Sequence, residues 1–463
     1  MPIPTELATA CADVRLAEDA DSIAGRRARY VAAPASTEEA SALLRAAAAL
    51  GLTVVPRGAG RLQHWGNPPD SCDLIVDTRR LDRILEHVPA DLTVTVQAGV
   101  RLQDLEEALA PARQTVALFP PPPAYAGTVG GLIATNVAGS HRHRFGTPRD
   151  RLTGITAVRA DGTIVASSDP AAIGGRDLVA LLAGSFGSLG LITEATFRLE
   201  PTPQVFGSVA LNCDDPEHAE RLVDEVSDPW IAPLGIDLRW PSADEQLRLF
   251  AMLQGDQQDY EARSARLYAL AGHQAPPPID HAHPLRLDDP DHAGLPPDLA
   301  RRLLAERARI RAEIEDPAPD TGTLVRVSFP PARLAGTLTL IRAAAADAGV
   351  DAAIEGSVVA GVLDVTVPAE TLAAAVARFI VALRAGLDEL RAGLDALRAE
   401  LGELSQPATA TPAVRAVVVY APSEVRDLTD AHGPVPSLAL LRAVKDEFDP
   451  EHRMAPGRLA DAV

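Results

Sequence analysis

Three glycine-rich stretches in the first 200 residues have the composition of loops that bind phosphate groups. They are Arg57–Leu62, Gly127–Gly139 and Gly184–Gly190, and they alternate with segments that resemble strands. Successive backbone N–H groups in such turns form concave sites for phosphate oxygens, and glycine lets the backbone approach a ligand closely. One such loop alone is more often a plain turn, but three in sequence favour a bound diphosphate.

The first loop differs from the usual dinucleotide-binding motif. The sequence PRGAGRLQHWGNPP follows the apolar run Leu52–Val55, a predicted strand. The usual motif needs a helix at the loop, so that the helix N-terminus faces the phosphates. Gly66, Asn67 and the two prolines after them prevent a helix here. We therefore expect loop amides alone to hold the diphosphate at this point, with the Thr128 hydroxyl of the second loop added.

Length, charge and cysteine content exclude several classes of protein. A chain of 463 residues favours two domains, and its net charge of −20 disfavours nucleic acid or anionic lipid as a partner. The cysteines, Cys11, Cys72 and Cys213, form no CxxC pattern, so we expect no disulfide framework and no cysteine-based metal site. Without a signal peptide or a run of about 18 apolar residues, the sequence predicts a cytoplasmic protein that does not span a membrane.

Alternating strands and helices must position the three loops. Residues 30–55 predict a strand, a helix and a strand, with Ser36 as the helix N-cap and Glu39 completing a capping box. Further strands are predicted over Cys72–Asp77, Leu92–Gln97, Thr156–Ser167 (a hairpin turning at Asp161–Gly162) and Leu191–Glu200, with helices over Leu102–Ala110 and Asp177–Ala183.

From Gln204 onward the pattern changes to a weak internal repeat of strand, helix, strand, strand and helix. Units of this kind build an antiparallel sheet with helices on one face. A polar, proline-rich linker, Pro276–Pro297, separates the two copies.

The last helix of the second copy begins near Glu370 and is unusually long. Its leucines form a heptad pattern: Leu383, Leu387, Leu390, Leu394, Leu397, Leu401 and Leu404. Gly386, Gly393 and Gly402 weaken it as an independent coiled coil. The sequence leaves two interpretations open, an arm that packs on its own domain and a contact with another subunit.

The residues around the glycine loops resemble a known family. They are similar to the FAD-binding domain of the vanillyl-alcohol oxidase/p-cresol methylhydroxylase (PCMH) type, and most similar to the FAD-binding E subunit of bacterial glycolate oxidase. The segments that carry this resemblance are VVPRGAGRLQHWGNPP, LDRILEH, VTVQAGVRLQDLEEAL, TVGGLIATNVAG, RFGTPRDRLTG, ADGTIV, GSFGSLGLITEATFRLEP and the tail KDEFDPEHRMAPGR.

The resemblance implies an α+β fold with two domains. An FAD-binding domain would span residues 1–203 and be completed by 438–463. A cap, or substrate, domain with an antiparallel sheet would span 204–437 and carry the long helical arm 369–405. The flavin ring would lie at the seam between the two domains, where the substrate enters.

The resemblance also implies which residues hold FAD. Residues Arg57, Gly58, Ala59, Gly60, Arg61 and Leu62 would surround the diphosphate. Residues Thr128, Val129, Gly130, Gly131, Ala134, Asn136 and Gly139 would line the diphosphate, the ribityl chain and the flavin ring, and the Ile192 backbone would meet the adenine. Arg61 stands where relatives with a covalent flavin place a histidine, so non-covalent FAD is expected. The Arg61 side chain either pairs with the diphosphate or points to solvent.

The sequence identifies no catalytic base. His64, His281, His283, His292 and His432 are each more often surface residues, and no helical spacing supports a metal site. The basic patch His141–Arg144 lies beside the expected flavin and is a candidate receptor for a carboxylate. The segment Ser168–Leu178 lacks the Lys, Asn and Tyr of the glycolate oxidase type, and Phe145 replaces a usual Tyr. These differences leave the substrate and the redox partner open.

The implied activity is FAD-dependent oxidation of a small alcohol or 2-hydroxy acid, glycolate-like, by hydride transfer to flavin N5. Electrons would pass to a partner iron–sulfur or second flavin subunit, or to oxygen. Two alternatives remain: a non-catalytic FAD-binding accessory subunit, and an oxidase acting on a larger metabolite.

Overall fold

The computed structural model describes residues 2–139, 141–168, 177–270, 285–286, 322–401, 414–435 and 437–458. His281, His283 and His292 lie outside these residues, as do most of Ser168–Leu178 and of the linker Pro276–Pro297. Short elements lie outside the three larger sheets: α1 (Thr5–Ala10), β2 (Ser22–Ile23), β3 (Arg26–Arg27), β9 (Gln114–Thr115), α4 (Pro122–Tyr125), α7 (Pro148–Arg151), β13 (Glu200–Pro201) and α14 (Ser423–Arg426).

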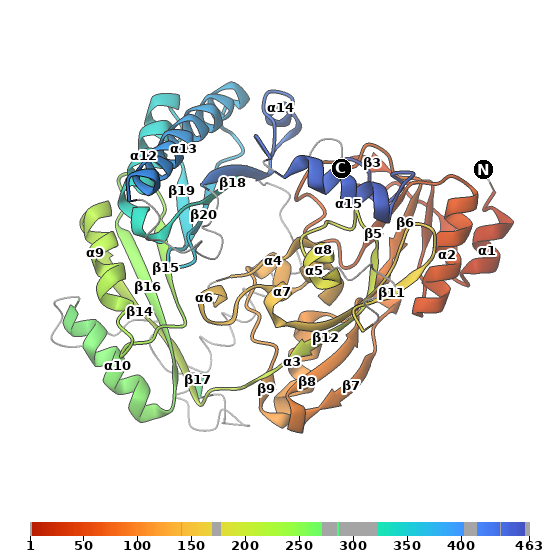
Figure 1. Ribbon diagram of the computed structural model, residues 1–463, viewed down its shortest axis with the longest axis horizontal. Helices are drawn as coiled ribbons and strands as arrows, with labels where there is room; N and C mark the ends of the chain where they lie inside the picture. Colours follow the sequence, from red (N-terminus) through yellow and green to blue (C-terminus); the bar gives the residue numbers. More distant parts are fainter. Residues whose placement is uncertain are drawn as a thin grey trace.

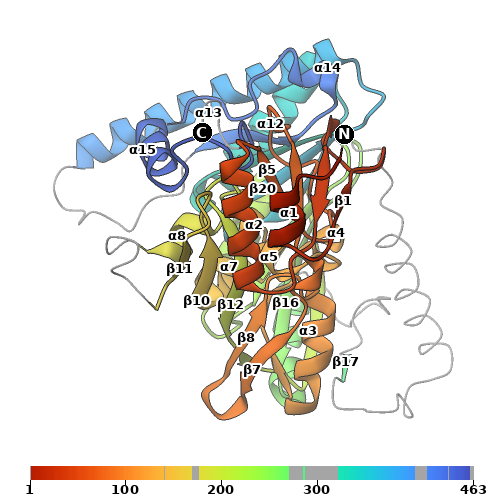
Figure 2. The same cartoon turned by 90° about the vertical axis from the view of Figure 1, so that its right-hand side faces the viewer.

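A small, mainly parallel sheet leads into the first glycine loop. Its order is β1 (Val14–Leu16), β4 (Tyr30–Ala32), β6 (Leu74–Asp77) and β5 (Val54–Arg57), and only β1 is antiparallel. Every residue of β6 is buried, as expected of a central parallel strand. Figure 2 shows α1 and α2 (Thr37–Ala49) side by side against this sheet.

The start of α2 confirms one half of the predicted capping box and corrects the other. The Ser36 hydroxyl accepts a hydrogen bond from the Glu39 N–H at 3.1 Å, as predicted. The Glu39 carboxylate instead accepts from the N–H groups of Ala35 and Ala12, each at 2.7 Å. Glu39 therefore ties the N-terminal segment to the helix, a contact 27 residues away in the chain that local spacing does not reveal.

A second sheet of five antiparallel strands carries the other two glycine loops. Its order is β11 (Ile164–Ala166), β10 (Leu152–Val158), β12 (Leu191–Arg198), β8 (Thr93–Gln97) and β7 (Ile84–Val88). The helices α3 (Leu102–Leu109), α5 (Val129–Thr135) and α8 (Leu178–Leu182) share its hydrophobic core. The predicted hairpin between β10 and β11 is confirmed, with Gly162 at φ +84°.

The third sheet has eight antiparallel strands and helices on one face (Figure 1). Its order is β17 (Leu285–Arg286), β14 (Val205–Cys213), β16 (Leu247–Gly255), β15 (Gly235–Trp240), β19 (Ala353–Ser357), β20 (Val362–Val367), β18 (Thr323–Ser328) and β21 (Arg415–Tyr420). Its covering helices are α9 (Pro216–Val226), α10 (Gln257–Leu270), α12 (Leu334–Ala348) and α13 (Ala373–Leu401). The predicted repeat of strand, helix, strand, strand and helix therefore occurs twice, as expected.

The first half of the long helix α13 packs against α12 and the eight-stranded sheet. Leu383 and Leu387 are buried in that core, and Leu390 packs partly against it. A Cβ at Gly386 would come within 2.2 Å of a Leu340 methyl carbon, so the glycine allows α12 and α13 to approach closely. Leu404 lies outside the described residues, and a contact of the arm with another subunit stays a prediction. None of the helices seen in the structure combines the length and apolar character that crossing a bilayer requires.

The C-terminal segment returns to the small parallel sheet. After α15 (Leu438–Phe448), the chain runs beside β5, where the Val54 N–H donates to Arg453 O at 2.8 Å and the Ala455 N–H donates to Val54 O at 2.7 Å. The tail is thus held at the strand that leads into the first glycine loop, while the exact domain boundaries stay predictions.

Candidate functional site

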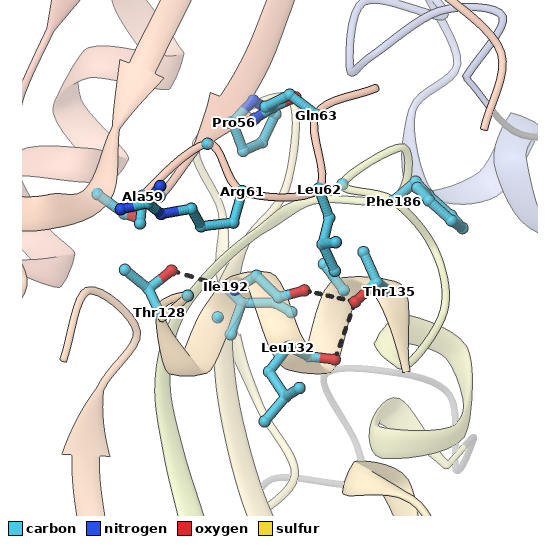
Figure 3. A pocket seen from close by; sticks show the side chains of 18 of the residues that line it. Pro56, Ala59, Arg61, Leu62, Gln63, Thr128, Leu132, Thr135, Phe186 and Ile192 are labelled. Carbon is cyan, nitrogen blue, oxygen red and sulfur yellow. Dashed lines mark hydrogen bonds between the residues drawn. The ribbon is translucent and has the colours of Figure 1, made fainter. Parts of the chain in front are cut away.

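The three glycine loops meet in one pocket (Figure 3). The first loop follows β5, the second ends in α5, and the third precedes β12. All three loops contribute to the lining, and the neighbouring segments add the rest. The lining residues are Pro56, Gly58, Ala59, Gly60, Arg61, Leu62, Gln63, Thr78, Ala124, Gly127, Thr128, Gly130, Gly131, Leu132, Ala134, Thr135, Phe186, Gly187, Gly190, Leu191 and Ile192, together with Arg458 of the tail.

The first loop is a series of turns and not the start of a helix, as predicted. Gly60 has φ +74°, a left-handed conformation that favours glycine. A Cβ at Gly58 would lie 2.0 Å from the Thr128 hydroxyl oxygen, so the first two loops touch at a point where only glycine fits. The Gly66 N–H then donates to Val419 O of β21 at 2.7 Å, which ties this loop to the eight-stranded sheet.

The second loop is closed by Thr128, whose hydroxyl oxygen accepts the Gly131 N–H at 3.4 Å and caps α5. The third loop is anchored to the end of that helix. Gly184 N–H donates to Ile133 O, and Phe186 N–H donates to Ala134 O. Phe186 has φ +52°, an unusual conformation for a bulky residue, and it places its ring at the pocket.

Two arginines, the buried Arg458 and the half-buried Arg61, line this pocket. The Nε atoms of Arg61 and Arg458 are buried and have no hydrogen-bond partner among the residues that the structure describes. Arg458 Nη1 donates to Gln63 O at 2.8 Å, and its guanidinium lies 5.9 Å from the centre of the Phe186 ring. Burial lowers the pKa of Arg458 to about 10, so the side chain stays charged at neutral pH. The pocket therefore combines glycine amides with two arginines that form no ion pair with any described residue, which fits a bound diphosphate.

Ten of the fourteen residues predicted to bind the cofactor line this pocket: Gly58, Ala59, Gly60, Arg61, Leu62, Thr128, Gly130, Gly131, Ala134 and Ile192. The other four lie beside it, outside its lining. Arg57 forms ion pairs with Asp21 and Asp77, and Val129 is fully buried. Asn136 accepts the Arg149 N–H through its side-chain oxygen, and Gly139 packs on the Phe119 carbonyl.

The sequence analysis did not assign a role to Arg458, although it quoted the tail that contains it. The sequence feature that could have pointed to Arg458 is its place as a basic residue at the end of a segment that resembles the family. Its hydrogen-bond partner, Gln63, lies 395 residues earlier in the chain. Its place in the pocket follows from the return of the tail to β5.

The histidines considered from sequence fall in different surroundings. The His141 ring packs 3.8 Å from Phe119, and burial lowers the pKa of His141 to about 4, which leaves it neutral at pH 7. The His64 ring lies 5.0 Å from Tyr420, and burial together with the Arg458 charge lowers the pKa of His64. Within the described ranges no group of histidine, cysteine and acidic residues has the arrangement of a metal site.

Comparison with known proteins agrees with this site. Residues 28–168 match the FAD binding domain family. Glycolate oxidase subunit GlcD of Bacillus subtilis is 31% identical over 212 residues, 45% of this chain and 44% of that protein. D-lactate dehydrogenase of Archaeoglobus fulgidus is 34% identical over 200 residues, 42% of this chain and 44% of that protein. The chain thus spans less than half the length of these curated relatives.

The solved structure of p-cresol methylhydroxylase with substrate bound superimposes with a TM-score of 0.65 at 15% identity. The match covers 98% of this chain and 96% of that one. This likeness shows the fold, so the predicted two-domain α+β fold of the PCMH type is confirmed.

The fold and the site define a flavoprotein. The chain contains a domain of the FAD binding family, and FAD is its cofactor. The predicted resemblance to PCMH-type proteins and to glycolate oxidase subunits is confirmed. The glycolate oxidase relative reported above is named subunit GlcD, and the closer likeness to the E subunit stays a prediction.

Proposed function

We propose that this protein is an FAD-dependent oxidoreductase that oxidises a small alcohol or 2-hydroxy acid. The observation that carries the proposal is the meeting, in one pocket, of three glycine loops and two arginines whose Nε atoms have no partner among the described residues. The names of the relatives, glycolate oxidase and D-lactate dehydrogenase, support a 2-hydroxy acid as the substrate.

We assign binding roles to this chain's own residues. The amides of Gly58 and Gly60 face the diphosphate, and Arg61 and Arg458 neutralise its charge. When bound, FAD supplies the two-electron oxidation chemistry. The FAD is non-covalent, because Arg61 cannot form the histidyl link of relatives whose flavin is attached at that position.

The electrons leave for a second protein in this proposal, an iron–sulfur or second flavin subunit. The three cysteines are buried and far apart, so the described part of the chain offers no thiolate ligands for a cluster of its own. We place the protein in the cytoplasm.

An absorbance spectrum of the purified chain, before and after acid precipitation, tests the cofactor assignment. Flavin bands that move to the supernatant support non-covalent FAD, and bands that stay in the pellet contradict it. Anaerobic bleaching by glycolate or D-lactate then tests the activity. A chain that binds FAD but is reduced by no alcohol or hydroxy acid would instead favour an accessory subunit.

A further inference from the structure

Five charged side chains form a row across the eight-stranded sheet. In neighbouring strands, Arg248 lies opposite Arg239, Arg239 opposite Glu355, Glu355 opposite Asp364, and Asp364 opposite Arg326. Directly opposed residues of antiparallel strands project from the same face. These five residues, here called the charged row, therefore lie side by side on one face across β16, β15, β19, β20 and β18.

The charged row lies on the face that turns away from the helices. Its sequence neighbours Leu238, Ile354 and Leu363 belong to the core beneath α9, α12 and α13, and side chains alternate between faces along a strand. The opposite face looks toward the FAD-binding half of the molecule (Figure 1). There the Arg326 guanidinium lies 5.3 Å from the centre of the Trp65 ring, three residues after the first glycine loop.

Charge is unevenly balanced within the row. Arg326 and Asp364 form a bidentate pair at 2.7 and 2.8 Å. Arg239 and Arg248 are exposed, and neither side chain has an ion pair or hydrogen bond with any described residue. Burial and the charge of Asp364 raise the pKa of Glu355, while the charge of Arg239 lowers it. The row itself thus holds three arginines and two carboxyl groups, and Asp237, two residues before Arg239 in β15, adds a third carboxyl group on the same face.

Arg142 adds another cation from the FAD-binding half. It begins α6 (Arg142–Phe145), which contacts β15. Its guanidinium makes no ion pair with any residue in the described ranges. Burial lowers the pKa of Arg142, and the charge of Arg326 lowers it further, while Asp364 and Asp150 oppose the shift. Arg142 therefore lies within the electrostatic reach of the Arg326–Asp364 pair and of Asp150, but none of the described carboxylates forms an ion pair with it.

We propose that Arg142 and the charged row form the binding site for a carboxylate of the substrate, with Asp364 holding Arg326 in position. The inference rests on the proposed function, because it assigns the anion site of the same reaction. A carboxylate is favoured over a neutral alcohol because it would supply the counter-ion that Arg142 lacks. Of the patch predicted from sequence, only Arg142 takes this role, since His141 is buried and neutral and His143 and Arg144 are exposed.

Calorimetric titration of the FAD-loaded full chain with oxalate tests this site. Oxalate carries carboxylates but no oxidisable C–H bond, so binding is measured apart from turnover. We expect saturable binding that weakens about tenfold or more in Arg142→Gln, from the loss of a charge-assisted hydrogen bond. Arg142→Lys should recover part of it. Arg144→Gln, which removes an exposed charge from the same helix, is the matched control and should bind within twofold of wild type.

Oxalate binding by Arg142→Gln within twofold of wild type, with the flavin spectrum intact, would overturn the inference. The inference would also be overturned if the wild-type chain did not bind oxalate but a neutral alcohol reduced its flavin. In that case the proposed function would still stand. If oxalate binding depends on Arg142 but no alcohol or hydroxy acid reduces the flavin, the carboxylate site itself stands, while the proposed function and the assignment of this site to its substrate fail.

Discussion

Replacing Lys445 by methionine would break the main polar contact between the C-terminal helix and the third glycine loop. Both Lys445 and Asp449 have fully buried side chains and form an ion pair at 2.7 Å. Lys445 Nζ also donates to Ser188 O at 2.7 Å and to Met454 O at 2.8 Å. Methionine keeps the length of the side chain but removes all three hydrogen bonds.

The expected cost follows from what the substitution leaves behind. The Asp449 carboxylate would still accept the hydrogen bond from the Met454 N–H at 2.6 Å, but it would lose its buried counter-ion, Lys445. Removing one partner of a buried ion pair costs about 3–5 kcal/mol, a large share of the roughly 5–15 kcal/mol that stabilises a typical domain. Because Ser188 lies in a loop that lines the pocket, the substitution should also weaken FAD binding.

Denaturant unfolding followed by flavin fluorescence and circular dichroism measures both effects. The double variant Lys445→Met with Asp449→Asn removes the stranded charge and should recover part of the lost stability. Arg442→Met on the exposed side of α15 is the control and should change the unfolding free energy by less than about 0.5 kcal/mol. A Lys445→Met chain within about 1 kcal/mol of wild type would refute this reasoning.

Two further predictions concern the pocket and the response to pH. Gly58→Ala should abolish FAD retention in an absorbance assay, because its Cβ would meet the Thr128 hydroxyl oxygen at 2.0 Å, while Gly336→Ala, which meets nothing within 4 Å, should retain FAD fully. Burial raises the pKa of Glu106 from 4.5 to about 7, so its contribution to stability is present below pH 4.5 and is lost as the pH rises to 7. Glu106→Gln should therefore gain up to about 3 kcal/mol in unfolding free energy above pH 7 and nothing at pH 4. Equal gains at both pH values, or the same gain in the neighbouring Glu107→Gln, would contradict the assignment.

Features that depend on local chemistry were predictable from the sequence. Glycine loops without a following helix, the hairpin at Asp161–Gly162 and the Ser36 cap each follow from the conformations that a few adjacent residues allow. The spacing of apolar residues predicted the strands of the antiparallel sheet and its covering helices, because this spacing is also a local property of the chain. The resemblance to FAD-binding proteins also rested on short segments in a fixed order.

Only the tertiary structure decided the contacts between distant parts of the chain. Arg458 reaches the pocket because the tail runs beside β5, and Lys445 holds a loop 257 residues before it. The charged row exists because strand register places Arg239, Glu355 and Asp364 opposite one another. A single sequence shows the alternation along each strand but not the register between strands. Long-range packing sets that register, so these sites could be found only in the folded molecule.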